Sequence, residues 1–168
     1  ENTITQKRTL SSFEGIDVSS AIAVTVNDGD YDGAITIEAP DNIMDKIVTE
    51  VNNGVLKISI KGTVNLNNSQ IKVNFPHKKL RSFSISGASN VKVIPTLKVD
   101  QLAIDLSGAS NLKLDVVSNQ IAVDNSGASS MKISGNVQDL AISVSGASSL
   151  IAKDLKAANV VVDCSGAS

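Results

Sequence analysis

The stretch SFSISGASNVKV, residues 82–93, contains the first of five copies of the tetrapeptide Ser-Gly-Ala-Ser. Successive copies start 21, 19, 19 and 20 residues apart, so the spacing is nearly constant. Identical tetrapeptides at such a spacing indicate an array of structural repeats of about twenty residues. The copies begin at Ser86, Ser107, Ser126, Ser145 and Ser165.

Apolar and polar residues alternate on both sides of each tetrapeptide. A period of two residues is typical of a strand with one buried face. No segment keeps the period of about 3.6 residues that a helical solenoid would need. The apolar residues in the third place before each tetrapeptide are expected to be buried in one line: Phe83, Ile104, Val123, Ile142 and Val162.

One strand before and one strand after a fixed corner, repeated about every twenty residues, describe a coil that stacks on its predecessor. A single coil cannot bury its apolar face, so its stability depends on the neighbouring coils. The sequence therefore predicts an all-β fold, a single-stranded right-handed parallel β-helix that forms one solenoid domain over residues 1–168. Regular Ser-Gly-Ala-Ser coils are expected over residues 80–168, and irregular capping coils with a hairpin over residues 1–79.

The corner residues have distinct expected roles. The glycine of each copy permits a positive φ angle, and the adjacent alanine is small enough to point inward at a tight bend. The serine hydroxyls can bond backbone groups of the corner. A polar ladder is expected directly after the corners, formed by Asn90, Asn111, Ser130 and Ser149.

The N-terminal half is less regular. Residues 15–21, followed by residues 24–26, show the same in–out pattern as the repeats and are interpreted as a degenerate coil. Asn53-Gly54 is a strong two-residue hairpin signal between strands at 47–51 and 55–60. Also expected are strands at Ala34–Ala39 and Ile71–Phe75, a loop at 27–33 and at most one helical turn after Pro40.

The composition limits both the core and the partners. Aromatic residues make up only 2% of the 168 residues, which suits thin stacked layers better than a core built around large side chains. The net charge of −2 provides no basic field that would attract nucleic acid. No run of 18 apolar residues is present, so no membrane-spanning segment is predicted. Cys164 is the single cysteine, which excludes an intrachain disulfide, and its apolar surroundings predict a buried side chain.

The order of these features resembles that of a known family. The segments "RTLSSFEGIDVSSAIAVTV" and "ITIEAPDNIMDKIVTEVNNGVLKISI" and the repeated "SISGAS" are similar to the bacterial family described as "putative auto-transporter adhesin, head GIN domain". The resemblance covers essentially the whole chain. It implies an exported β-helical protein at the cell surface, at the outer membrane or in the periplasm of a Gram-negative bacterium. It brings no catalytic residues with it.

The motif Asp28-x-Asp30-x-Asp32 resembles the front half of a calcium loop, in which ligands occupy alternate positions. The twelfth position of that pattern is Ala39 rather than a glutamate, and no helices are predicted on either side. We therefore expect an acidic loop without a metal, and leave calcium binding open as the alternative.

Charged residues recur at fixed places beside the corners. Asp105, Asp124 and Asp163 precede the corners, and Ser143 fills the gap in this row. Paired carboxylates about 5 Å apart also serve retaining glycosidases. Such enzymes hold sugars in clefts with aromatic rings, which this chain nearly lacks. We expect solvated charges that keep the strands soluble, and interpret a second row in the same way: Lys92, Lys113 and Lys132.

A short basic cluster surrounds Pro76. We expect it to be a solvated turn, with a docking patch for an anionic glycan or lipid headgroup as the alternative. Asn125 occupies a place that is apolar in the other repeats, so it is expected to be buried and bonded to corner backbone or a trapped water. The basic cluster comprises His77, Lys78, Lys79 and Arg81.

No catalytic, cofactor-binding or metal-ligating residues are predicted. Scarce aromatics, a single histidine and the lack of long loops favour a non-enzymatic exported surface module, an adhesin or structural protein with an extracellular protein or glycan as partner. One alternative is a carbohydrate-active β-helix enzyme of the pectinase type, which a groove with convergent Asp, Lys and Arg would favour. The other is an envelope protein that binds a small molecule or lipid, which a closed apolar pocket would favour.

The strand at residues 160–164 has high β propensity, and only Asp163 discourages pairing at its edge. Val161 is expected on the outward face, where the earlier coils carry Ala or Ser. Stable arrays need a cap at each end. We therefore expect further coils after Ser168 or another molecule at this end, such as a second copy in a homo-oligomer.

Overall fold

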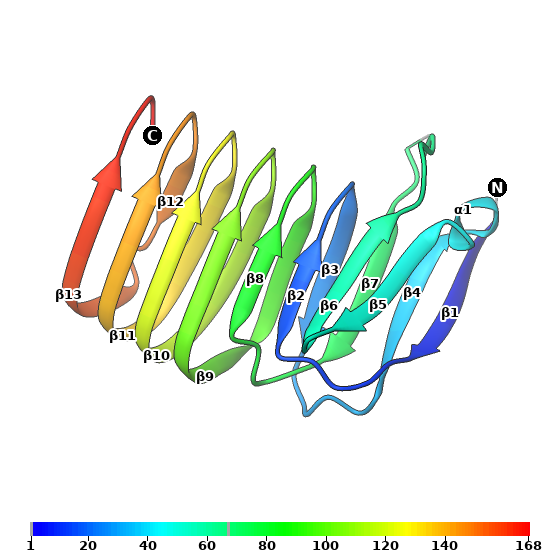
Figure 1. Ribbon diagram of the computed structural model, residues 1–168, viewed down its shortest axis with the longest axis horizontal. Coiled ribbons are helices and arrows are strands. Elements are labelled where there is room, and N and C mark those ends of the chain that lie inside the picture. Colours follow the sequence, from blue (N-terminus) through cyan, green and yellow to red (C-terminus); the bar gives the residue numbers. More distant parts are fainter. Residues whose placement is uncertain (1, 67) are drawn as a thin grey trace.

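Parallel strands dominate the structure, a computed structural model that describes residues 2–66 and 68–168. Thirteen strands form one sheet that winds into a flattened β-solenoid (Figure 1). We call the face formed by the strand arms before each Ser-Gly-Ala-Ser corner the front face, and the face formed by the arms after it the back face. No helix in the described part of the chain is long and apolar enough to cross a membrane.

The regular coils confirm the predicted parallel array. Three long strands bend once each, so that each supplies a back arm followed by a front arm (Figure 1). They pair in parallel, with Ile104 opposite Val123 and Val123 opposite Ile142. The strands of this array are β8 (Ser82–Ile85), β9 (Asn90–Leu106), β10 (Asn111–Asn125), β11 (Ser130–Val144), β12 (Ser149–Ile151) and β13 (Leu155–Cys164).

The corners require glycine for two reasons. Gly127 has a φ angle of 71°, and a Cβ atom there would lie 2.6 Å from the carbonyl oxygen of Gly108 in the preceding corner. This close approach lets the amide of Ala128 donate a hydrogen bond of 2.8 Å to the same oxygen. The predicted positive φ angle is confirmed at the remaining corners: Gly87, Gly108, Gly146 and Gly166.

The inward residue of each corner is the second serine, so the prediction that the alanine points inward is wrong. Ala128 is exposed, whereas Ser129 is buried. The Ser129 hydroxyl donates a hydrogen bond of 3.4 Å to the carbonyl oxygen of Gly108, so a serine fills the tight corner and binds its backbone, as expected for the hydroxyls. The same place is buried in three other corners and exposed at Ser168 of the last one: Ser89, Ser110 and Ser148 are the buried serines.

The core consists of apolar side chains stacked in columns between the two faces. Four members of the predicted line are buried: Phe83, Ile104, Val123 and Ile142. The prediction is wrong for Val162, which is 54% exposed because the last coil has a neighbour on one side only. For the same reason Cys164 is exposed and not buried as predicted.

The degenerate coil near the N-terminus is confirmed, and it stacks directly on the regular array. β2 (Gly15–Val18) pairs in parallel with β8, and β3 (Ile22–Asn27) pairs in parallel with the back arm of β9. Between them Ser20 takes the place of the corner glycine, with a φ angle of 71°. Its carbonyl oxygen accepts a 2.9 Å hydrogen bond from the amide of Ala88, as in the regular corners.

The order of the coils in space differs from their order in the sequence. β6 (Val55–Ile60) and β7 (Ile71–Pro76) pair in parallel with the other edges of β2 and β3. β6 and β7 therefore lie outside the coil formed by β2 and β3, although they follow it in the chain. The chain then returns past that inner coil and begins β8 on its far side (Figure 1).

An antiparallel cap closes the N-terminal end of the array. β4 (Ala34–Pro40) pairs with β7, and β1 (Thr3–Thr9), a strand that the sequence did not predict, pairs with β4. β5 (Ile47–Asn52) pairs with β6 through the predicted Asn53-Gly54 turn. The helix α1 (Asp41–Met44) is the single predicted turn.

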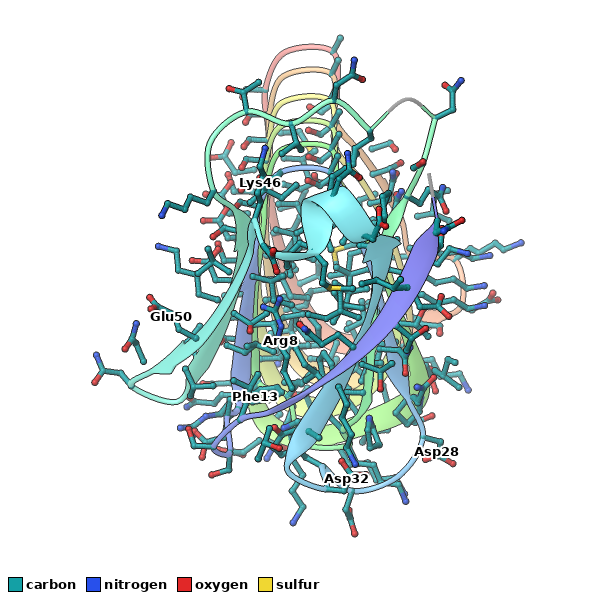
Figure 2. The ribbon with its side chains drawn as sticks, turned by 90° about the vertical axis from the view of Figure 1, so that its right-hand side faces the viewer. Arg8, Phe13, Asp28, Asp32, Lys46 and Glu50 are labelled. Carbon is teal, nitrogen blue, oxygen red and sulfur yellow. The ribbon has the colours of Figure 1, made fainter. Side chains whose placement is uncertain are left out.

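Arg8 of β1 ties this cap together across the end of the solenoid (Figure 2). Its Nη1 atom donates hydrogen bonds of 2.7 Å to the carbonyl oxygen of Ile47 and of 3.0 Å to Thr49 Oγ1. Its Nη2 atom donates one of 3.1 Å to the carbonyl oxygen of Met44. One guanidinium thus connects β1 to β5 and to the end of α1, where a helix leaves carbonyl groups unpaired.

Candidate functional site

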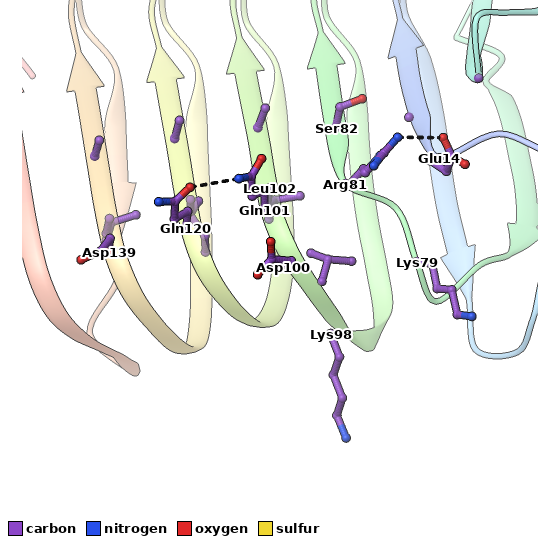
Figure 3. A pocket seen from close by; sticks show the side chains of 18 of the residues that line it. Glu14, Lys79, Arg81, Ser82, Lys98, Asp100, Gln101, Leu102, Gln120 and Asp139 are labelled. Atoms are coloured by element: carbon purple, nitrogen blue, oxygen red, sulfur yellow. Dashed lines mark hydrogen bonds and ion pairs between the residues drawn. The ribbon is translucent and has the colours of Figure 1, made fainter.

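Small side chains form one column along the front face, in register on neighbouring parallel strands. Longer side chains flank this column on both sides, which makes it the floor of an open groove along the solenoid axis. Figure 3 shows those on the side of the bend. From β2 to β13 the groove crosses six strands, a length of about 24 Å at the usual strand spacing. The floor over these six strands consists of Gly15, Ser82, Ala103, Ala122, Ala141 and Val161, and Val55 of β6 lies next to its N-terminal end.

The groove contains two adjoining hollows. The larger, of about 860 Å³, lies toward the bend between the back and front arms and is bordered by Gln101, Gln120 and Asp139. The smaller, of about 530 Å³, lies toward the corners and is bordered by Asp105 and Asp124. Both hollows share the apolar floor, so a bound partner would meet methyl groups below and polar groups along both sides.

Side chains on the bend side of the groove are held by bonds between neighbouring coils. Gln101 Nε2 donates a hydrogen bond of 3.2 Å to Gln120 Oε1 (Figure 3). Asn159 Nδ2 donates one of 2.9 Å to Asp139 Oδ1. Such ladders fix the side chains in place before any partner arrives, which reduces the entropy lost on binding.

At the N-terminal end of the groove, Arg81 Nη2 lies 3.2 Å from Glu14 Oε2 (Figure 3). Both side chains are more than half exposed, and surface ion pairs of this kind contribute about 0–1 kcal/mol. The pair therefore defines the end of the groove more than it stabilises the fold.

The predicted row of aspartates lies on the corner side of the groove, and we call it the Asp column. Asp105 is directly opposite Asp124, Ser143 fills the gap as expected, and Asp163 follows on β13. Asp105 and Asp124 are exposed, and neither carboxylate forms a hydrogen bond or an ion pair with a described residue. Their placement agrees with the expected solvated charges.

The second predicted row lies on the back face, and we call it the Lys column. Lys92, Lys113 and Lys132 lie opposite one another on β9, β10 and β11, and all three are exposed. None of the three side-chain amino groups forms a hydrogen bond or an ion pair with another described residue. The corner side of the groove therefore carries a row of negative charges, and the back face carries a row of positive charges.

The structure does not bring the acidic loop residues together. Asp28 Oδ1 lies 3.7 Å from Lys78 Nζ, and Asp30 and Asp32 belong to the same exposed connection between β3 and β4. Across residues 2–66 and 68–168, no group of three or more His, Cys, Asp or Glu side chains is gathered in a way that could hold a metal ion.

His77 is buried, with only 5% of its surface exposed, so the expected solvated turn is wrong at this residue. Its Nδ1 atom accepts a hydrogen bond of 3.0 Å from the amide of Lys79, which leaves Nε2 to donate one of 2.7 Å to the carbonyl oxygen of Phe13. Burial lowers the pKa of the His77 imidazole below its ordinary value of 6.5. The remaining members of the basic cluster face solvent.

The sequence analysis missed the aromatic cluster that surrounds this histidine. The ring centroid of Phe13 lies 4.6 Å from that of Tyr31 and 5.3 Å from that of Phe75. These residues come from three distant segments. The chain has only four aromatic residues, three Phe and one Tyr, and all of them precede the first Ser-Gly-Ala-Ser copy. This grouping in the sequence is the signal that could have suggested a contact.

Asn125 is buried as expected, and its Nδ2 atom donates a hydrogen bond of 2.9 Å to the carbonyl oxygen of Ser149, next to a corner of another coil. Its Oδ1 atom has no partner among the described residues. The side chain points into the core, so it is bonded next to a corner and does not face the groove.

The charged side chains that line the groove repeat along its axis and do not converge on one point. Among the carboxylates that line it, Glu14 pairs with Arg81, and Asp100 accepts a 2.6 Å hydrogen bond from Asn119. The others follow one another along the axis, one per coil. This arrangement favours binding of an extended or repeating partner over catalysis at one bond of a substrate.

A family model described as "Putative auto-transporter adhesin, head GIN domain" matches residues 12–168. None of the curated proteins matches the chain. Several solved structures have a similar fold but low sequence identity to this chain, so they support the fold and not a function.

A putative adhesin from Bacteroides fragilis NCTC 9343 has a TM-score of 0.87 and 24% identity, with 98% of this chain and 77% of that one covered. A putative adhesin from Parabacteroides merdae ATCC 43184 has a TM-score of 0.81 and 18% identity, with coverage of 98% and 78%. A structure from Parabacteroides distasonis ATCC 8503 has a TM-score of 0.72 and 19% identity, with coverage of 97% and 78%, and is named a putative lipid binding protein.

Proposed function

Because the chain belongs to the family described as "putative auto-transporter adhesin, head GIN domain", we propose that it is a non-enzymatic exported surface module that binds an extended partner along the groove of its front face. The groove itself carries this proposal. It is continuous over six strands, has an apolar floor and is bordered by polar side chains that neighbouring coils hold in place. The partner is an extracellular protein or a glycan.

An enzyme of the pectinase type is disfavoured by the distribution of the charges. Lys79, Arg81 and Lys98 do line the same hollow as Asp100 and Asp139, but they do not converge on one point (Figure 3). A glycosidase needs two carboxylates on opposite sides of one scissile bond. The Asp column runs along one side of the groove, where two neighbouring carboxylates face a partner from the same side.

Lipid binding is the second candidate, because one similar structure is named a putative lipid binding protein and the floor of this groove is apolar. A lipid tail is favoured by a closed apolar pocket that buries most of its surface. The groove is open and has carboxylates and amides on both sides, which favours an extended polar partner.

The family supports an exported location, at the cell surface, at the outer membrane or in the periplasm of a Gram-negative cell. The single sheet of 13 strands supports one solenoid domain with a capped N-terminal end. The C-terminal end offers a second contact, because Val160, Val161 and Val162 are each more than half exposed on a strand with one unpaired edge. Further coils or a second copy of the chain would cover this edge. Light scattering at micromolar concentration tests whether a second copy binds.

An array of glycans, extracellular-matrix proteins and lipids, read with and without calcium, tests the proposal. Ala122→Trp places a large side chain on the floor of the groove and is expected to weaken binding at least about tenfold by steric exclusion. Ile94→Trp adds the same side chain at an exposed residue of the back arm of β9, which lines neither hollow, and serves as the matched control. Equal binding by both variants would show that the partner does not use the groove.

A further inference from the structure

Two columns of like charge remain without partners on opposite faces of the array. Elsewhere on these faces, stacked polar side chains bond to one another: Asn111 Nδ2 donates a 2.7 Å hydrogen bond to Asn90 Oδ1, and Ser130 Oγ lies 2.7 Å from Ser149 Oγ. The predicted ladder after the corners is thereby confirmed for these two pairs. The Asp column and the Lys column instead place equal charges side by side on adjacent strands.

Like charges directly opposite each other on neighbouring strands destabilise a sheet. A row of opposite charges with the same repeat distance would relieve this repulsion at every coil. The repeat distance of both columns is set by the spacing of parallel strands, about 4.8 Å. Few partners carry charges at that interval, but the other face of the same molecule does.

We propose that a second copy of this chain is a partner of the groove, with the Lys column of one copy lying along the Asp column of the other. This inference rests on the proposed use of the groove as a binding site. The lysine side chains are long and would form a ridge, whereas the floor beside Asp105 and Asp124 consists of alanines. A ridge of lysines therefore fits the shape of the groove as well as its charge.

The position of the two columns along the strands supports this arrangement. Asp124 lies two residues before the corner that starts at Ser126, and Lys132 lies three residues after Ser129 at the end of the same corner. At about 3.3 Å per residue, both columns are within about 10 Å of the corners. A copy displaced perpendicular to the sheets, without rotation, thus brings the Lys column close to the Asp column.

Such a contact joins two different surfaces of the same protein. A contact of this kind does not close on itself when the copies are related by translation, so it produces an open stack. Association would be weak and sensitive to salt, because exposed charge pairs contribute little individually and are screened over about 10 Å at an ionic strength of 0.1 M.

The test is sedimentation velocity over a range of protein concentrations, at low salt and at 0.5 M NaCl. The wild-type chain is expected to self-associate at low salt and to dissociate at least about tenfold more readily at high salt. The variant K92E/K113E/K132E makes both faces acidic, and D105K/D124K makes both faces basic. Each variant alone is expected to be monomeric, and an equimolar mixture of the two is expected to associate.

Recovery in the mixture distinguishes the proposed contact from loss of folding, which circular dichroism of each variant checks separately. A wild-type chain that stays monomeric at low salt overturns the inference. So does association that persists in both variants and ignores salt, because that result points to the C-terminal edge. If either occurs while Ala122→Trp still abolishes binding on the array, the groove keeps its proposed function and only the second copy is excluded as its partner.

Discussion

The imidazole of His77 and the carbonyl group of Phe13 are joined by a hydrogen bond of 2.7 Å across 64 residues of sequence. Phe13 lies in the connection from β1 to β2, and His77 lies in the connection from β7 to β8. The bond therefore holds together two connections that are far apart in the sequence. The second hydrogen bond of this ring, which Nδ1 accepts from the amide of Lys79, needs a neutral imidazole, since a proton on Nδ1 would break it.

Stability is expected to fall when the pH drops below about 6.5. Burial lowers the pKa of His77 in the folded state, although the hydrogen bond to the Phe13 carbonyl and the charges of Glu14 and Asp30 oppose this, and the charge of Lys79 assists it. The stabilisation is complete above pH 6.5 and is lost as the pH falls toward the folded pKa, because the unfolded chain binds the proton first. Thermal unfolding between pH 8 and pH 5 measures it. The melting temperature of His77→Phe should depend less on pH over this range than that of the wild type. Identical pH profiles of the two proteins would show that His77 does not cause the loss of stability.

Replacing Gly127 with valine is expected to lower the free energy of unfolding by about 3 kcal/mol. The substitution adds a β-branched side chain at a positive φ angle and places its Cβ atom against the carbonyl oxygen of Gly108. Urea denaturation measures the change. Ala128→Val, at the exposed neighbouring residue, is the matched control and should stay within about 0.5 kcal/mol of the wild type. A similar effect of both variants would mean that the corner tolerates side chains in general.

Asn125→Leu is expected to raise the free energy of unfolding by up to about 1 kcal/mol. The buried Oδ1 atom has no partner within residues 2–66 and 68–168, and an unsatisfied buried polar group costs about 1–3 kcal/mol. Leu106 and Val144, which lie opposite Asn125 on the neighbouring strands, show that an apolar side chain fits this column. Urea denaturation of the leucine and alanine variants separates the loss of the amide from the loss of volume. A leucine variant less stable than the wild type would show that the bond to Ser149 outweighs the unsatisfied oxygen.

No hydrolysis or elimination is expected on plant or host polysaccharides, because the exposed carboxylates do not converge on one point. Release of reducing sugars and of unsaturated products from a polysaccharide panel checks this. Turnover that disappears in D105N/D124N would overturn the non-enzymatic proposal. Turnover that persists in this variant would indicate a contaminating enzyme.

The sequence was informative where structure follows from local spacing. The constant interval between glycines such as Gly108 and Gly127 predicted the corners, and the period-two alternation predicted which side chains of the regular coils point inward. The same pattern failed at Val162 and Cys164, because an inward direction leads to burial only where another coil covers the side chain. It also assigned the inward place at the corner to alanine instead of the serine that bonds the preceding carbonyl group.

Contacts between distant segments could not be predicted in this way. The contact of Ile16 with the strand of Phe83, the cluster around His77 and the anchoring of β1 by Arg8 all depend on how the N-terminal segments are ordered in space. Spacing along the sequence does not report that order. The groove was missed for a related reason, since alanines that occur once per coil form a floor only after the coils have stacked in register.

The placement of the coil at residues 15–27 between two later segments has a consequence for the order of folding. Its strands β2 and β3 meet one neighbour in β6 and β7 and the other only when β8 and β9 have been synthesised. Contacts this far apart in sequence form slowly, because a long loop must close first. Each regular coil, in contrast, can add to its predecessor as soon as it emerges. Residues 15–27 are thus among those that must wait for the middle of the chain, so this coil gains its second pair of neighbours only after the chain has been made as far as β9.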